Sequence, residues 1–175
     1  MKKIGIATLF SACLLATPAF ATLLSVPSAP VITAPDADSL FTSTNPKLNA
    51  NKQVVYHIIR DLLEAGHWEL ASRYLSPEYI QHNPNAASGR KAIVDYFTHV
   101  LKVKPRPIPQ HIQMGITSVV AEGDLVIVSY PRKVNDSHVK GGQYTTTWFD
   151  MWRIKNGKAV EHWDPALRMR SPTLE

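Results

Sequence analysis

Cysteine is almost absent from the 175-residue chain, in which Cys13 is the only one. It lies in a segment, 1–21, with the three parts of a secretory signal peptide: two lysines, an apolar run over 4–16 and small residues ending at Ala21. We expect cleavage after Ala21, which leaves no cysteine. The remaining chain then has no disulfide, no thiolate nucleophile and no cysteine metal site, and its leader predicts a periplasmic or secreted protein.

Long hydrophobic runs are also missing. The apolar run of the leader is too short to span a bilayer stably, so we expect no stable membrane span. The alternatives for this segment are a membrane anchor, a buried N-terminal helix, or lipid attachment at Cys13. The short run and the small residues before the expected cleavage site favour a leader that is removed.

The chain lacks a basic patch, although its formal charge is +5. Removal of the leader takes away two lysines and lowers this charge to +3. The remaining basic residues are scattered, and only Lys102, Lys104 and Arg106 lie close together, without interleaved aromatic residues. We therefore expect no nucleic-acid partner.

The composition divides the rest of the chain into an arm and one domain. Residues 22–50 are rich in proline, serine and threonine without a sustained period, which indicates an arm or linker whose apolar residues could dock on the domain. The domain is expected over 51–175 and begins with a helix capped by Asn51. Two further helices are predicted over 67–75 and from Ser88 to about 101.

Beyond Pro109 the apolar period changes to two, which predicts strands. Glu122-Gly123 and Asn156-Gly157 are expected to be hairpin turns. Three helices followed by an antiparallel meander predict an α+β domain with the helices on one face of a curved sheet. The expected strands cover 111–121, 124–134, 143–154 and 158–167.

The last hairpin holds the densest set of polar residues. A three-residue loop over 155–157 would place Asp150 opposite His162, whereas a two-residue turn would place Asp150 opposite Trp163. We favour the first register, because it gathers the ionisable groups beside tryptophans and pairs an arginine with a glutamate on the other face. The predicted inner face carries Trp148, Asp150, Trp152, Ile154, Val160, His162 and Asp164, and the outer face carries Arg153 and Glu161.

Two aspartates and a histidine among tryptophans point to acid–base chemistry. Burial and the proximity of two carboxylates shift proton affinities, as a group that removes a proton beside a carbonyl requires. The alternative is structural: Asp150 and His162 satisfy each other inside the sheet.

A second cluster surrounds Pro84. His82 and Asn83 lie on a short extended segment that the proline stiffens, so either side chain could point into a cavity or could cap the turn. His111, at the start of the first long strand, is a further candidate. The histidines show neither HxH nor HExxH spacing, so we predict no metal site.

Three motifs together resemble the SnoaL-like polyketide cyclase family of the nuclear-transport-factor-two-like superfamily, over about 50–170. They are Tyr79-x-x-His-Asn-Pro followed by Gly89 and a helix, an Ala-Glu-Gly-Asp hairpin ending at Asp124, and an Asp-x-x-Arg…Asn-Gly-Lys-x-x-Glu-His-Trp-Asp run ending at Asp164. The resemblance implies a cone-shaped sheet around helices with an apolar pocket, frequent dimerisation through the sheet, and no metal or organic cofactor. The chain departs from the family at Pro165, which shortens the last strand.

The resemblance also implies roles for single residues. Asp164 would be the catalytic acid/base, with His162, Asp150 and His82 as pocket partners. The family includes isomerases, hydrolases, cyclases and non-catalytic binders, so the fold does not fix the reaction. We expect either a cofactor-free acid–base enzyme acting on a small apolar carbonyl compound or a carrier that uses the same pocket. The expected ligand-binding residues are Tyr79, His82, Asn83, His111, Trp148 and Trp152.

Overall fold

The centre of the fold is a curved five-stranded sheet, seen in a computed structural model that describes residues 29–136 and 141–168. The strands follow the order β1-β5-β4-β3-β2, with antiparallel neighbours except that β1 runs parallel to β5. The sheet is not closed, because β1 and β2 form its two edges. The strands are β1 (Leu75–Gln81), β2 (Ser118–Glu122), β3 (Leu125–Asn135), β4 (Gln143–Lys155) and β5 (Lys158–Trp163).

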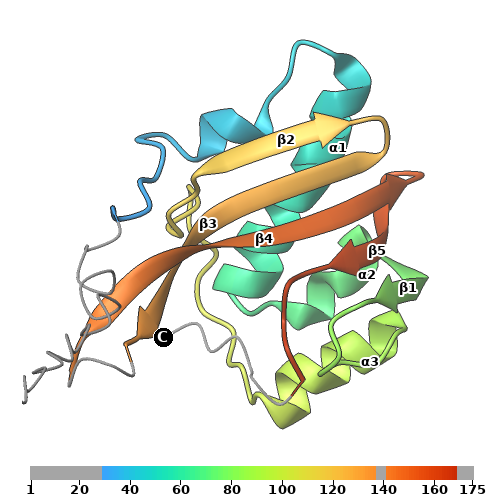
Figure 1. Cartoon of the computed structure of the whole chain (residues 1–175). Coiled ribbons are helices and arrows are strands. Elements are labelled where there is room, and N and C mark those ends of the chain that lie inside the picture. The colour runs from blue at the N-terminus through green and yellow to red at the C-terminus, as the bar shows by residue number, and fades with distance from the viewer. Residues whose placement is uncertain (1–28, 137–140, 169–175) are drawn as a thin grey trace, which may run out of the picture.

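Three helical segments lie on one side of this sheet (Figure 1), so the α+β prediction is confirmed. No helix within the described ranges has the length and apolar character needed to cross a bilayer. Apolar side chains of the first helix and of the inner sheet face are buried together and form the core. The helices are α1 (Pro46–His57), which continues as a π-helix over Ile58–Glu64; α2 (Ala71–Tyr74), after a 3-10 turn at Trp68–Leu70; and α3 (Arg90–Asp95), continued by a π-helix over Tyr96–Val100.

The first helix begins earlier than predicted, at Pro46 rather than near Asn51. Asn45 caps it, because its side-chain oxygen accepts the backbone N–H of Lys47 at 3.0 Å, and Pro46 suits the first helical position. Asn51 is instead buried within the helix. Its amide donates to the carbonyl of Gly123 at 3.1 Å, which fastens α1 to the β2–β3 turn.

Part of the predicted arm packs against the domain. The structure describes residues 29–50 of it, and the Phe41 ring is fully buried, in edge contact with Tyr56 at 5.6 Å between centroids. Farther upstream, the backbone N–H of Ala34 donates to the carbonyl of Ile116 at 2.7 Å. Ile32 does not dock, since its side chain is 80% exposed. The predicted leader, 1–21, lies outside the described residues.

The β4–β5 hairpin turns on two residues, Asn156 and Gly157, both with positive φ (52° and 72°). Lys155 therefore pairs with Lys158, as in the tight turn that Asn-Gly favours. A bulge follows, in which β5 carries one extra residue at Val160.

The bulge changes which residues face one another. His162 pairs with Trp152, whereas the favoured three-residue loop predicted that it would pair with Asp150. Trp163 pairs with Met151, so the alternative pairing with Asp150 is wrong as well. Both expectations failed because the stretch around residue 160 contains no glycine or proline that would indicate a bulge.

The predicted inner face is nevertheless confirmed for its polar and aromatic residues. The turn and the bulge each shift the register by one residue, and two such shifts return the side chains to the same face. Arg153 and Glu161 meet on the outer face, with 3.0 Å between Nε and Oε2. The inner face carries buried Trp148, Asp150, Trp152, Ile154 and His162, and Ala159 takes the place expected for Val160.

Candidate functional site

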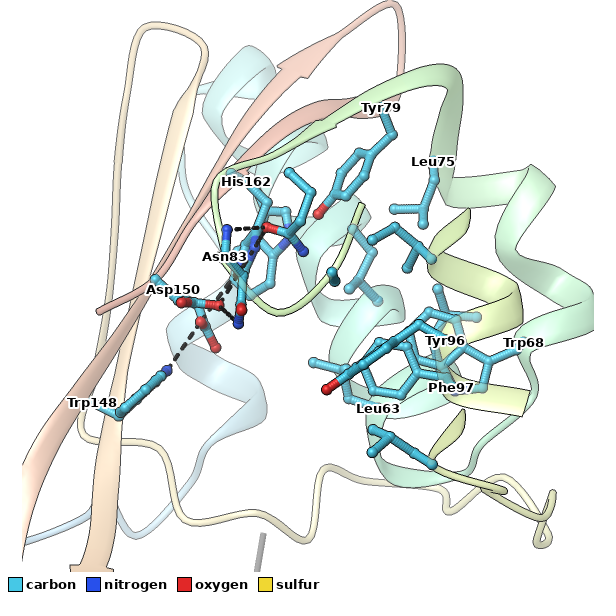
Figure 2. A pocket seen from close by; sticks show the side chains of 18 of the residues that line it. Leu63, Trp68, Leu75, Tyr79, Asn83, Tyr96, Phe97, Trp148, Asp150 and His162 are labelled. Carbon is cyan, nitrogen blue, oxygen red and sulfur yellow. Dashed lines mark hydrogen bonds and ion pairs between the residues drawn. The ribbon is translucent and has the colours of Figure 1, made fainter. Parts of the chain in front are cut away.

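A pocket with a volume of about 130 Å³ lies between the inner sheet face and the helices (Figure 2). A cavity near this size holds a molecule of about one ring. The wall formed by the helices is apolar and aromatic, and the polar groups gather on the wall formed by the strands. The helical wall includes Ile58, Leu62, Leu63, Trp68, Ile93, Tyr96 and Phe97.

Asp150, on β4, accepts three hydrogen bonds. Trp148 Nε1 and His162 Nε2 lie 3.1 and 3.2 Å from Oδ1, and the Tyr130 hydroxyl donates to Oδ2 at 2.6 Å. Burial, and next the charge of Asp150, raise the pKa of Tyr130 far above its usual value, so this phenol keeps its proton and acts as the donor. Asp150 is thus fixed in place and its oxygens are occupied.

The hydrogen bonds also assign protons to His162. Gln81 Oε1 accepts the backbone N–H of Asn83 at 3.1 Å, which identifies that atom as the amide oxygen. His162 Nδ1 lies 2.8 Å from the same oxygen and must therefore carry a proton. The contact between Nε2 and Asp150 needs a second proton, on one partner or the other. The Asp150–His162 pair therefore holds a proton between its two side chains.

Asp164, just after β5, is the second carboxylate of the pocket. Its Oδ2 accepts from Asn83 Nδ2 at 2.7 Å, and its Oδ1 accepts the backbone N–H of Ala166 at 2.8 Å. The Asn83 amide is oriented by the backbone N–H of Asn85, which donates to its oxygen at 2.9 Å. Both oxygens of Asp164 are thus acceptors, as in an ionised carboxylate, and each has a further lone pair.

The charge balance of the pocket lining is negative among the described residues. Among the described residues that line the pocket there is no lysine or arginine. By contrast, the buried Asp61, outside the pocket, lies 2.8 Å from Arg60 Nε. With two carboxylates and one histidine, this lining favours neutral ligands over anionic ones, because an anion would be repelled in a poorly solvated space.

The cluster of Asp150, His162 and Asp164 has residue types that could bind a metal ion. One ligand atom from each of the three residues lies within 4.8 Å of the others, so distance alone would allow an ion. The hydrogen bonds, however, already occupy both histidine nitrogens and point donors at both carboxylates. An ion would have to displace these donors, so the arrangement fits proton sharing better than ligation.

Most of the residues expected at the site line the pocket, and two do not. His82 points to the outer face, where Nε2 lies 2.8 Å from Glu161 and the ring stacks on Trp163. His111 is mostly exposed and bonded to Asp38 at 2.7 Å. Strand alternation explains His82, because Tyr79 points inward and the residues two positions along share its face. The expected residues that line the pocket are Tyr79, Asn83, Trp148, Asp150, Trp152, His162 and Asp164.

Two polar residues of the pocket were missed in the sequence. Gln81 follows Tyr79 by two positions on β1 and orients His162. Tyr130 follows the buried Val128 by two positions on β3 and orients Asp150. The same period-two argument that was applied to the last hairpin would have indicated both, had it been applied to these strands.

A sequence profile described as the SnoaL-like domain matches residues 57–162. No curated protein sequence matches the chain. A similar structure is that of a candidate polyketide cyclase from Acidithiobacillus ferrooxidans, with 15% identity over 70% of this chain and 89% of that one and a TM-score of 0.49. IdmH of Streptomyces antibioticus, a candidate polyketide cyclase, is 18% identical over 65% and 89%, with a TM-score of 0.46. Because the profile match extends from the end of α1 to β5, the chain belongs to the SnoaL-like domain family.

Proposed function

We propose that the protein is an acid–base enzyme that removes a proton beside the carbonyl of a small, neutral, largely apolar compound. The observation that carries the proposal is the Asp164 carboxylate, which lines the pocket, accepts hydrogen bonds from an amide and a backbone N–H, and has His162 Nδ1 4.0 Å away. A carboxylate with a further lone pair on each oxygen can accept a proton from a substrate.

The proposed step is balanced within the pocket. The C–H bond of the substrate breaks, the proton goes to Asp164, and the electron pair moves to the carbonyl oxygen to form an enolate. Return of a proton to another carbon gives isomerisation, and attack of the enolate carbon on a second carbonyl gives cyclisation. His162 also lies close by, since its Nδ1, whose proton Gln81 accepts, is 4.0 Å from Asp164 Oδ2.

A carrier that holds its ligand unchanged is the second candidate, favoured by the hydrogen bonds that satisfy Asp150, His162 and Asp164 without a ligand. Exchange of the α-protons of a ketone in D₂O, followed by ¹H NMR, separates the two functions. The enzyme is expected to exchange the methyl protons of acetophenone faster than buffer does. Binding of acetophenone without exchange would support the carrier.

We also propose a homodimer formed through the outer sheet face. Val120, Ile127, Met151 and Trp163 lie opposite one another in a row across the four strands from β2 to β5, and Phe149 beside them is 52% exposed. An apolar row on an open sheet face is typical of an interface. Phe149→Asp is expected to convert a dimer to a monomer in analytical ultracentrifugation, and a monomeric wild-type protein would contradict the proposal.

Export is a further proposal, supported by the leader predicted at 1–21. When the full chain is expressed in a bacterium with a periplasm, N-terminal sequencing of the exported protein is expected to begin at Thr22. Recovery of only the uncleaved chain in the cytoplasm would contradict it.

A further inference from the structure

Tyr79 is a buried polar residue that the proposed proton transfer does not use. It lies on β1 and is 3% exposed, and Figure 2 shows its ring pointing from the strand into the pocket. Burial raises the pKa of Tyr79 far above its usual value and outweighs the opposing hydrogen bond from Trp152. The phenol is therefore protonated, and its O–H is available to donate.

Three other tyrosines also have a raised pKa, and the hydroxyl of each donates a hydrogen bond to a carboxylate. Tyr56 donates to Asp38 at 3.3 Å, Tyr74 to Asp61 at 2.6 Å, and Tyr130 to Asp150 at 2.6 Å. Within 29–136 and 141–168, no hydrogen bond gives the Tyr79 O–H such an acceptor, and the Trp152 indole lines the same pocket. An indole N–H only donates, so it leaves the phenol proton unclaimed.

An unclaimed donor inside a pocket indicates what the pocket binds. Buried phenols normally find an acceptor, because an unsatisfied polar group costs about 1–3 kcal/mol. A ligand that fills the pocket can supply this acceptor. Tyr79 and the proposed base Asp164 line the same pocket, so one ligand can contact both.

We infer that Tyr79 donates a hydrogen bond to the carbonyl oxygen of the ligand, so that the pocket selects carbonyl compounds over hydrocarbons of the same shape. This inference rests on the proposed function and adds the group that receives the developing charge. As Asp164 takes the proton, negative charge moves to the carbonyl oxygen, and a fixed donor there stabilises the enolate more than the ketone.

A matched pair of probes tests the inference. Acetophenone and ethylbenzene share a skeleton and differ in the carbonyl oxygen, and isothermal titration calorimetry measures the binding of both compounds. Tyr79→Phe is expected to weaken acetophenone about tenfold and to leave ethylbenzene within about twofold. It should also slow the α-proton exchange of acetophenone about a hundredfold.

Tyr74→Phe is the control, because it removes the same hydroxyl from a tyrosine that is bonded to Asp61 and does not line the pocket. It should leave both affinities unchanged. The carbonyl ¹³C resonance of acetophenone bound to the wild-type protein provides a measurement that needs no variant, and a downfield shift relative to water is expected.

The outcomes separate the two proposals. If acetophenone binds and Tyr79→Phe changes neither its affinity nor its ¹³C resonance, the donor role of Tyr79 is wrong while the pocket proposal stands. If neither probe binds to the wild-type protein, the pocket does not hold small aromatic compounds. The proposed function and the inference then fail together.

Discussion

Asp164→Asn is expected to slow the α-proton exchange of acetophenone in D₂O about a thousandfold. The substitution keeps the size of the side chain, and its amide oxygen can still accept the backbone N–H of Ala166. It replaces Oδ2, the carboxylate oxygen to which Asn83 Nδ2 donates, by an amide NH₂ group, so that two amide N–H donors face each other at this contact. Proton removal is therefore lost, whereas the apolar walls that bind the probe are untouched.

Binding and stability are the controls for this variant. The affinity for acetophenone, from isothermal titration calorimetry, should stay within about threefold of the wild type. Asp124→Asn is a matched substitution on the surface, where Asp124 pairs with Arg153 at 3.0 Å, and it should leave the exchange rate unchanged. Exchange at the wild-type rate in Asp164→Asn would show that another group is the base, and Asp150 would be the first to test.

The elements that local patterns specify were predictable from the sequence. Residues close in sequence determine both the helical period of the first helix and the alternation of the last hairpin. The buried face of each element, including the inward side chains of Asp150 and His162, could therefore be identified. The exact start of α1 could not be predicted, because the helical turns before Val54 are mostly polar and only the cap at Asn45 indicates where the helix begins.

Features that depend on distant contacts could not be predicted. The pairing of β1 with β5 joins segments about 80 residues apart, as in Gln81 with His162. Alternation from Tyr79 indicates that Gln81 shares its face, but only the pairing with β5 brings Gln81 within hydrogen-bond distance of His162. The bulge at Val160 is similar, since it is stabilised by the whole sheet rather than by a local turn residue.

The segment before α1 was predicted to be an arm whose apolar residues could dock on the domain, and the contribution of Phe41 measures how firmly it is attached. Phe41→Ala is expected to lower the free energy of unfolding by about 3–5 kcal/mol, which is the usual cost of truncating a fully buried phenylalanine. The loss combines the transfer of the ring out of the core with a cavity beside Tyr56, whose ring is in edge contact with Phe41. Urea unfolding followed by circular dichroism measures it.

Ile32→Ala is the matched control, because the same segment carries this apolar residue with its side chain 80% exposed, and its substitution should change stability by less than about 0.5 kcal/mol. An equally small effect of Phe41→Ala would mean that the segment is a separable arm, as its composition suggested. A large effect would place the domain boundary before Phe41. Phe41 contacts Tyr56 on α1, and α1 continues into the π-helix that carries Ile58 and Leu62. Phe41 therefore packs behind the helix that forms part of the pocket wall.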